Sequence, residues 1–591
     1  MSDKKTHWFF SSATSIFILF FVSIYLKTIL FHLFIFGSDD LTQLIYFSKF
    51  VPALCIASFV FITKRKIWTA IFLFLADVWL ISNIIYFKAN EALLDIETTL
   101  LVNNMQGFWS SVLLYLNWEL IPFLVISILY TFYLTKYQSN GERHWKLFIS
   151  IILFTFIIHF LDLEYRREIG LFHSKAKQKE ISEKYGHYTI FFRDAKYKAC
   201  GNHWRGMDDY VEKNTIFHYF PAQFVYYKYK QQTINQKVKF TNSDSLSIQK
   251  RILIPAERPH ANKNLFLIIV ESLESWPLGM TDVNGQEITP TLNKFSQQAD
   301  FVCLNCKSQV RRGVSGDGQL IINTGLLPME TNVACMAYGT NTYPNFAQYF
   351  KSSFTINPCP NVWNQAVVNP QYGYKELVEM DNSSADSSWL NDHEIFSLAV
   401  KTLDRCEFPT CMQVITYSTH TPFKVIATDN LQFHNDMPTK LQNYLHALHY
   451  TDSCINYFLT ELHNHPQFSD STTIVITGDH TVFKSYMLQS FKPFVEKHSL
   501  SIPTTQSYCP LLITSKCQTN KQTKKDSCFQ MDIFPTITHF IGLEETYWKG
   551  FGINLMDSSA TRTITEDSSY YLSNKLIIDN YFKNIPVYQN Q

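Results

Sequence analysis

The chain has 591 residues, of which 46% are hydrophobic and 17% charged, and its formal net charge is +1. This length is too great for a single hydrophobic core and predicts two or three domains. The balanced charge gives no electrostatic basis for nucleic-acid binding. The apolar residues crowd into about the first 165 positions, so we expect a membrane anchor followed by a globular domain.

Five apolar runs in the N-terminal third are of a length that suits bilayer-spanning helices, which need about 20 residues. We expect the spans at Trp8–Phe36, Leu44–Thr63, Trp68–Phe87, Phe108–Leu134 and Lys146–Leu161. Basic residues gather in the loops between spans two and three and between spans four and five, and positive loops stay in the cytoplasm. A five-span helical domain over residues 1–163 therefore places the rest of the chain on the outer side.

Asp77 lies within the third predicted span. An ionisable residue at membrane depth is by default a candidate functional group. The alternative is that Asp77 only orients the helices through a polar partner. The candidate partners near one face of the membrane are Asn83, Trp118 and Glu119.

Residues 164–260 are polar and rich in tyrosine, which predicts a partly helical connector along the membrane surface, with one helix at Ser174–Tyr185. Short apolar strands then alternate with helical stretches over residues 261–558, which predicts a mostly parallel sheet covered by helices. Residues 559–591 form a tail packed on this domain or following it. Strands are expected at Leu265–Val270, Thr410–Thr416, Ile474–Thr477 and Tyr508–Thr514, and helices at Thr289–Ala299, Asn345–Lys351 and Leu441–His463.

Two of the expected strands end in acidic residues. Glu271 follows Leu265–Val270, and Asp479 and His480 follow Ile474–Thr477. Open α/β sheets bind ligands at the carboxyl ends of their strands, and carboxylates with one imidazole suit Mn²⁺, Mg²⁺ or Zn²⁺. Taken singly, Glu271 is also compatible with an exposed loop acid and His480 with a structural histidine, but the ordered set favours a metal site.

Two further residues complete the expected site. Ser315 lies in the glycine-rich segment Gly313–Gly318, which predicts a turn. A hydroxyl bound to a metal can attack without a neighbouring base. His420 follows the strand Thr410–Thr416, so its imidazole is expected at the same rim, where it can bind a phosphoryl oxygen or protonate a leaving alkoxide. The alternatives are an ordinary turn serine and a loop histidine that caps a turn.

The sequence has 12 cysteines, one of them in a predicted span. Three close pairs are candidate disulfides in an oxidising compartment: Cys303/Cys306, Cys406/Cys411 and Cys517/Cys528. The first pair also has half of a zinc-finger spacing. Because no second pair or His-x-x-x-His motif follows it, a structural zinc is disfavoured.

Several motifs in register resemble the lipoteichoic acid synthase and phosphoglycerol transferase family, which is sulfatase-like and part of the alkaline phosphatase superfamily. They lie within roughly residues 260–556 and read IIVESLES, EITPTLNKF, GVSGDGQ, TGLLP, STHTPF, YTDSCINYFL, VITGDH, QMDIFPTI and GFGINL. The five spans ahead of them fit the same family. The resemblance implies an α/β alkaline-phosphatase-like domain outside a bacterial cell (inner) membrane.

The resemblance also implies roles for individual residues. The metal ligands are matched by Glu271, Ser315, Asp479 and His480, and Ser315 takes the position of a nucleophile that is usually threonine. The ion implied is Mn²⁺, with Mg²⁺ and Zn²⁺ as alternatives. Ser315 is followed by Gly-Asp-Gly and lacks the x-Pro-x-Arg sequence that formylglycine formation needs, so a sulfatase reaction is not expected.

Substrate contacts are expected from His420, Trp363, Gln365 and Arg312. His420 matches a substrate-binding histidine, and Trp363 matches an aromatic residue that lines the headgroup pocket. Gln365 stands where the synthases carry an arginine that clamps phosphoglycerol. Loss of that bidentate donor weakens the assignment of phosphatidylglycerol as donor and leaves the assignment of phosphotransfer unchanged. Arg312, near Ser315, is expected to help bind the phosphate.

We therefore expect a membrane-bound, metal-dependent phosphotransferase. It would move a phospholipid headgroup of the phosphoglycerol type through a covalent intermediate on Ser315. The acceptor would be a hydroxyl of an envelope glycan, lipid or polymer. A phosphoethanolamine transferase or phosphodiester hydrolase of the same superfamily is the alternative, and a non-enzymatic envelope-binding protein is the second alternative.

Overall fold

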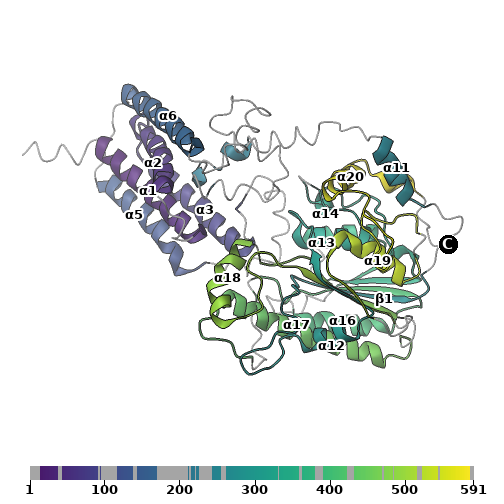
Figure 1. Ribbon diagram of the computed structural model, residues 1–591. Coiled ribbons are helices and arrows are strands. Elements are labelled where there is room, and N and C mark those ends of the chain that lie inside the picture. The colour runs from purple at the N-terminus through teal and green to yellow at the C-terminus, as the bar shows by residue number, and fades with distance from the viewer. Residues whose placement is uncertain are drawn as a thin grey trace, which may run out of the picture. The chain divides into compact units, whose positions relative to one another are not determined.

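The computed structural model describes residues 13–36, 43–90, 93–94, 116–136, 143–168, 211, 215–217, 219, 221–224, 242–253, 261–329, 332–357, 362–379, 391–421, 423, 431–468, 472–483, 485–515, 522–543 and 546–585. The chain divides into two compact units, one of residues 1–102 and 108–238 and one of residues 103–107 and 239–591. The described part of the first unit is helical, and the second is built on a β-sheet (Figure 1).

Among its described residues, the first unit contains four helices that are long and apolar enough to cross a membrane. They cover Ala13–Phe36 (α1), Ile67–Lys88 in α3 (Ile67–Asn90), Trp118–Lys136 (η3, Trp118–Leu120, with α5, Ile121–Lys136) and Trp145–Asp162 in α6 (Trp145–Glu168). A shorter apolar stretch, Phe47–Phe61, lies in α2 (Gln43–Ser58) and η1 (Phe59–Phe61). This arrangement agrees with five predicted spans, of which the second is short. Residues 8–12 and 108–115 of the predicted spans lie outside the described residues.

Lys27 of α1 and Asp77 of α3 form a buried ion pair. Ser127 of α5 donates a hydrogen bond to Asp77 Oδ2 at 2.5 Å, and Lys27 also donates to the carbonyl of Phe123. A charge removed from water needs such partners, because an unpaired one costs several kcal/mol. The three helices are therefore joined by one polar network. The prediction that Asp77 has one of three other partners is wrong; these were Asn83, Trp118 and Glu119.

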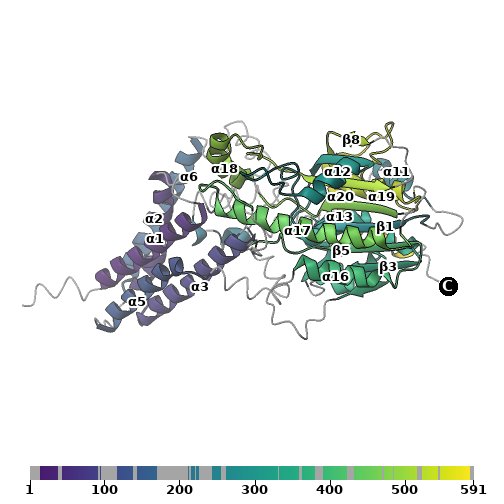
Figure 2. The same cartoon turned by 90° about the horizontal axis from the view of Figure 1, so that it is seen from below.

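The second unit is a nine-stranded sheet with helices on both faces (Figures 1 and 2). In spatial order its strands are β4 (Glu376–Val378), β3 (Ser352–Ile356), β5 (Thr410–Ile415), β1 (Asn264–Val270), β6 (Thr472–Gly478), β7 (Cys509–Ser515), β2 (Phe301–Lys307) and β8 (Thr523–Lys525), and β9 (Cys528–Phe529) also pairs with β2. Strand β7 is antiparallel to both neighbours, whereas the other pairings are parallel. The predicted, mostly parallel sheet is confirmed.

Strand β1 is buried along its whole length. Because side chains alternate between the two faces of a strand, Phe266, Ile268 and Val270 all enter one hydrophobic core. That core is shared with α12 (Pro290–Gln298), α16 (Asp392–Leu403) and α17 (Thr439–Asn464). The other face is covered by α13 (Val314–Thr324) and α19 (Ile533–Phe540) (Figure 1). A strand covered on both faces needs a continuous apolar sequence, which NLFLIIV supplies.

Two of the three predicted helices are confirmed as α12 and α17, and the third, Asn345–Lys351, is wrong. Only one 3₁₀ turn forms there, because Phe350 is already extended and strand β3 begins at Ser352. The predicted helix 174–185 lies outside the described residues. The remaining elements are α11 (Asn242–Arg251), α14 (Ala334–Ala337), η4 (Ala347–Tyr349), η5 (Val362–Asn364), α15 (Gln365–Gln371), α18 (Ser485–His498), η7 (Gln530–Asp532), α20 (Glu566–Ile578) and η8 (Tyr581–Asn584).

Candidate active site

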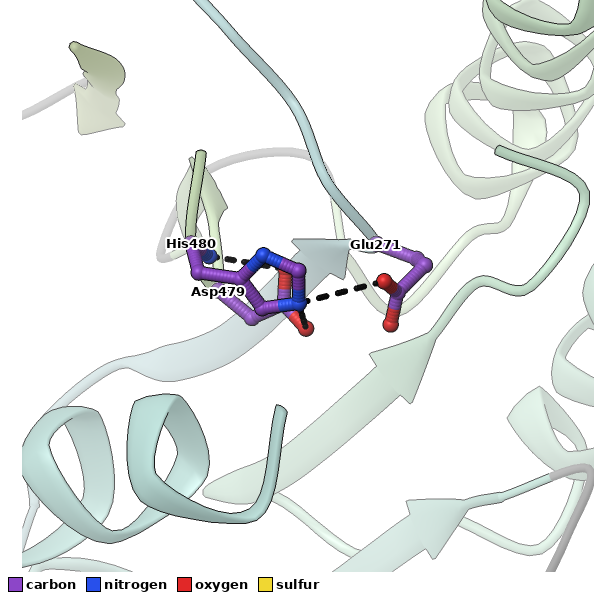
Figure 3. A group of neighbouring side chains, drawn as sticks. All are labelled: Glu271, Asp479 and His480. Carbon is purple, nitrogen blue, oxygen red and sulfur yellow. Dashed lines mark hydrogen bonds and ion pairs between the residues drawn. The ribbon is translucent and has the colours of Figure 1, made fainter. Parts of the chain in front are cut away.

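The neighbouring strands β1 and β6 bring two acids together. Val270 pairs with Gly478 in the register of the sheet, so Glu271 and Asp479 follow at the same edge, and His480 comes next. The possible ligand atoms of these three side chains all lie within 4.8 Å of one another, and all three side chains are buried (Figure 3). The carboxyl edge of the sheet therefore carries the cluster predicted from the strand ends.

Ser315 reaches the same point from α13. Its Oγ donates to Glu271 Oε2 at 3.0 Å and lies 3.2 Å from His480 Nε2. His480 Nε2 in turn lies 3.2 Å from Glu271 Oε1 and 3.5 Å from Asp479 Oδ2. Four side chains from three distant parts of the chain thus converge within hydrogen-bonding reach.

Ser315 is the second residue of α13 and does not lie in a turn, as the glycines around it had suggested. The start of this helix is shaped by buried Asp317, whose Oδ2 accepts the backbone N–H groups of Arg311 and Gly313, both at 2.9 Å. Val314 has a φ of 39°, which a β-branched residue rarely adopts, and such strain gathers at functional sites. The first turn of α13 therefore presents the serine hydroxyl to the acids.

The two acids are held by hydrogen bonds from residues next to them. The Ser272 N–H donates to Asp479 Oδ1 at 2.8 Å, and the Ser272 hydroxyl donates to Glu271 Oε1 at 2.7 Å. The side-chain amide of Gln530 donates to the Asp479 carbonyl at 2.6 Å. Gly318 is needed opposite this carbonyl, because a Cβ atom at position 318 would lie 2.5 Å from it. Helix α13 can approach β6 this closely only with glycine at that position.

The crowded charges shift the pKa values of all three ionisable groups. Burial and the charge of Glu271 raise the pKa of Asp479 to about 7. Burial opposes ionisation of His480, but Asp479 and Glu271 raise its pKa to about 10. Burial also opposes ionisation of Glu271, yet the attraction of His480 holds its pKa below the usual range. The site thus binds protons that a divalent cation would displace, and its oxygen and imidazole donors fit such a cation.

His420 lies in the loop that follows β5. Its Nδ1 donates to the carbonyl of Thr421 at 2.7 Å, and the ring stacks on Tyr417 with centroids 5.3 Å apart. His420 is within electrostatic range of Glu271. The loop is fixed by Asp392, whose Oδ1 accepts the N–H groups of Tyr417 at 2.7 Å and Ser418 at 3.0 Å. The histidine is therefore presented beside the four converging side chains.

The remaining predicted substrate residues differ in position. Trp363 has a left-handed φ of 53° and packs against helix α13, since a Cβ atom on Gly316 would lie 3.2 Å from its Cγ. Gln365 is only 2% exposed, and its Oε1 accepts a hydrogen bond from Asn369 at 2.9 Å. Arg312 is half-buried just before α13. Their roles in binding substrate stay predictions.

A second acid of the same sequence motif supports the site and was missed by the sequence analysis. Glu274 accepts the N–H groups of Val482 and Phe483, both at 2.9 Å, and the hydroxyl of Ser507 at 2.8 Å. These bonds fix the segment that follows His480. Burial raises the pKa of Glu274 to about 7. The available signal was its place in IIVESLES, three residues beyond Glu271, where a buried acid needs hydrogen-bond donors.

Comparisons with known proteins cover both units. Residues 1–200 match the lipoteichoic acid synthase N-terminal domain, and residues 263–543 match the sulfatase family. The chain is 22% identical over 537 residues to a lipoteichoic acid synthase of Staphylococcus saprophyticus, covering 87% of this chain and 78% of that protein. It is 24% identical over 387 residues to the lipoteichoic acid synthase-like YvgJ of Bacillus subtilis, covering 61% of this chain and 62% of that protein.

Two solved structures resemble the chain. Lipooligosaccharide phosphoethanolamine transferase A (EptA) from Neisseria meningitidis matches with a TM-score of 0.50 at 11% identity, covering 90% of this chain and 96% of that one. The lipoteichoic acid synthase LtaP from Listeria monocytogenes matches with a TM-score of 0.48 at 18% identity, covering 59% of this chain and 100% of that one. The first of these likenesses supports the fold of the chain.

The sheet, the cluster at its edge and the sulfatase match define a sulfatase-like enzyme of the alkaline phosphatase superfamily that transfers phosphate-containing groups. With the matching N-terminal domain ahead of it, the chain belongs to the lipoteichoic acid synthase family. It is accordingly a multi-pass membrane protein whose catalytic domain lies outside the cell membrane.

Proposed function

We propose that this enzyme moves a headgroup of the phosphoglycerol type from a membrane phospholipid to a hydroxyl of an envelope glycan, lipid or polymer. The observation that carries the proposal is the Ser315 hydroxyl, which is hydrogen-bonded within a buried cluster of two carboxylates and an imidazole. Support for the headgroup comes from relatives named lipoteichoic acid synthase. The membrane spans keep the domain near a lipid donor, which raises the effective donor concentration.

Glu271, Asp479, His480 and Ser315 would together hold one divalent cation. Mn²⁺ is our first choice, and Mg²⁺ and Zn²⁺ are the alternatives. When bound, the cation would lower the pKa of the serine hydroxyl and neutralise charge on the phosphate oxygens. The raised pKa values of Asp479 and His480 mean that these groups hold protons that a bound cation would displace. This expected proton release supports the assignment of a cation site.

In the first step, Ser315 Oγ forms a bond to the donor phosphorus, and the bond from phosphorus to the diacylglycerol oxygen breaks. The serine proton is lost to solvent before the attack, because Glu271 Oε2 accepts the hydrogen bond of the hydroxyl but has a pKa below the usual range and is a weak base. His420 enters this step protonated on both ring nitrogens, with its Nδ1–H donated to Thr421, and gives its Nε2 proton to the leaving alkoxide. Phosphoglycerol is then esterified to Ser315.

In the second step, the acceptor hydroxyl gives its proton to His420 Nε2 and attacks the same phosphorus. The bond from phosphorus to Ser315 breaks, and the serine oxygen takes a proton from solvent to replace the one lost in the first step. Both side chains return to their starting states, so one site serves donor and acceptor in turn. Trp363, Gln365 and Arg312 would bind the headgroup and its phosphate.

Phosphoethanolamine transfer is the second candidate function, with phosphodiester hydrolysis as a variant in which water is the acceptor. The observation that favours it is Gln365, a neutral and buried amide at the position where the resemblance leads us to expect an arginine. An amide cannot supply the bidentate, charged clamp for phosphoglycerol that a guanidinium provides.

The test uses the full-length protein in detergent with Mn²⁺ and either phosphatidylglycerol or phosphatidylethanolamine, and it measures release of diacylglycerol. We expect release from phosphatidylglycerol and an adduct of about 154 Da on the peptide that carries Ser315. Ser315→Ala should abolish both signals, whereas the matched control Ser315→Thr keeps the hydroxyl and should retain activity. Release of diacylglycerol from phosphatidylethanolamine alone would contradict the first candidate function and support phosphoethanolamine transfer. An active Ser315→Ala variant would refute both candidate functions.

A further inference from the structure

Four buried cysteines gather at the edge of the sheet, outside the cluster that forms the candidate active site. Cys303 and Cys306 lie on β2, Cys509 on β7 and Cys528 on β9. Their exposed fractions are 0%, 0%, 1% and 4%. All nine cysteines among the described residues are free thiols in the structure, so the predicted pairs Cys303/Cys306 and Cys406/Cys411 are not joined there, and Cys517 lies outside the described residues.

The sheet register places Cys306 between two other cysteines. It is the partner of Cys509 across the antiparallel pair β2–β7 and of Cys528 across the parallel pair β2–β9. Neighbouring strands lie about 4.8 Å apart, which is within the range of Cα separations found in disulfides. The backbone spacing therefore suits a bridge from Cys306 to either Cys509 or Cys528, and the positions of the thiols decide between them.

A bulge in β2 explains why Cys303 is near as well. Residues three apart on a regular strand point to opposite faces, but the pairing of β2 shifts between Cys303 and Cys306. This shift corresponds to one extra residue in β2, which turns the side chains of Cys303 and Cys306 to the same face. The thiols of Cys303 and Cys306 accordingly both contact that of Cys528.

The arrangement does not suit a metal ion. The thiolates around one zinc lie about 2.3 Å from it and hence within about 4 Å of one another. Within the described part of the chain, the cluster of Glu271, Asp479 and His480 is the only group of three or more acids, histidines and cysteines whose ligand atoms come within 4.8 Å of one another. Cys303 and Cys306 each lie near Cys528 but do not form a compact group with it. This arrangement fits a disulfide to Cys528 with one further thiol beside it better than it fits a shared metal ion.

We infer that Cys528 forms a disulfide with Cys306 outside the membrane, with Cys303 as the adjacent thiol. The oxidant is an extracytoplasmic dithiol–disulfide oxidoreductase, of the class that acts in such compartments. The Cys528 thiolate attacks the oxidant's disulfide and displaces one of its thiols. The Cys306 thiolate then attacks the Cys528 sulfur and displaces the second thiol, and the two protons lost by the cysteines end on the oxidant. Because both side chains are buried in the folded domain, this exchange takes place during folding.

The disulfide would also stabilise a segment that contacts the candidate active site. Gln530 comes two residues after Cys528 and donates to the carbonyl of Asp479 at 2.6 Å, while its Oε1 accepts the N–H of Gln309 at 3.0 Å. Strand β9 pairs with β2 over only two residue pairs. A covalent bond between Cys306 and Cys528 would therefore fix the start of the segment that positions the Asp479 backbone.

The test isolates the full-length protein with N-ethylmaleimide present throughout and digests it with trypsin without reduction. We expect mass spectrometry to find the peptide Phe295–Lys307 joined to Asp526–Lys549, with fragment ions that place the link at Cys306. The Cys528→Ser variant should lose this link and unfold at a temperature lower by about 5–10 °C. Dithiothreitol should lower the unfolding temperature of the wild type and leave that of Cys528→Ser unchanged.

Cys454→Ser is the matched control, because Cys454 is equally buried, at 2% exposed, but lies on α17. It should keep the link and the sensitivity to dithiothreitol. Complete labelling of Cys306 and Cys528 by N-ethylmaleimide would overturn the inference. A link from Cys528 to the peptide Cys517–Lys521 or to Cys303 would contradict the assignment of Cys306.

Discussion

Asp392 is expected to act on catalysis through the loop that carries His420. Its carboxylate accepts the N–H groups of Tyr417 and Ser418 at 2.7 and 3.0 Å and the hydroxyl of Thr451 at 2.5 Å. In Asp392→Asn, the remaining oxygen can still accept the N–H groups of Tyr417 and Ser418, but these bonds lose the carboxylate charge, and the new NH₂ group cannot accept the Thr451 hydroxyl. Charge-assisted hydrogen bonds contribute about 1.5–3 kcal/mol each, so we expect the free energy of unfolding to fall by about 2–4 kcal/mol.

Asp392→Asn should reduce activity by more than its loss of folded protein explains. A displacement of about 1 Å in a reacting group can reduce the rate by about 100-fold, so we expect kcat/KM per folded molecule to fall by that order in Asp392→Asn. The assay is release of diacylglycerol, with the folded fraction measured by circular dichroism. If Asp392 acts through His420, the double variant Asp392→Asn/His420→Ala should be no slower than His420→Ala alone.

Asp452 supplies a matched control. It is also 0% exposed, and it accepts two backbone N–H groups, those of Thr291 and Leu292 at 2.8 Å, but these belong to α12 rather than to the loop of His420. Asp452→Asn should destabilise the domain by a similar amount and leave kcat/KM per folded molecule unchanged. Equal losses of kcat/KM in the two variants would refute the positioning role of Asp392.

Three further predictions follow from buried contacts. Gly318→Ala should abolish metal binding, measured by isothermal titration with Mn²⁺, because its Cβ atom would lie 2.5 Å from the carbonyl of Asp479; unaltered affinity would contradict the contact. Asp77→Asn should destabilise the membrane helices by about 3–5 kcal/mol because Lys27 keeps a buried charge, and Lys27→Met/Asp77→Asn should recover much of this in detergent unfolding. Burial raises the pKa of Asp452 to about 6 from an ordinary 3.8. Its stabilising contribution is therefore present below about pH 4 and lost as pH rises through 6. Asp452→Asn should remove this dependence of the unfolding free energy on pH between about 4 and 6, and an unchanged slope would refute the assignment.

The sheet and the cluster of acids and histidine at its edge were predictable because they depend on local sequence. The run NLFLIIV is typical of a strand that is buried on both faces, and an acid placed directly after such a strand has a known position at the sheet edge. The adjacency of β1 and β6 then joins Glu271 to Asp479. These features need only the order of residues and the general rules for parallel sheets.

Other features depend on contacts between residues that are far apart in the sequence, and local sequence patterns do not indicate these contacts. The glycines around Ser315 indicated a turn, but Ser315 lies in a helix, and Gly318 permits the close approach of that helix, α13, to the Asp479 backbone. The partner of Asp77 is Lys27, 50 residues away, which no helical spacing indicates. Gln365 is buried against Asn369, a contact that its position in the motif did not indicate.

The most direct measurement is anomalous X-ray scattering from crystals of the protein grown with Mn²⁺. The account predicts a single manganese peak within about 2.0–2.5 Å of Glu271, Asp479, His480 Nε2 and Ser315 Oγ. It also predicts loss of that peak in the Glu271→Gln variant. A peak more than about 4 Å from Ser315 Oγ, or an active enzyme with no peak at this site, would contradict the central claim.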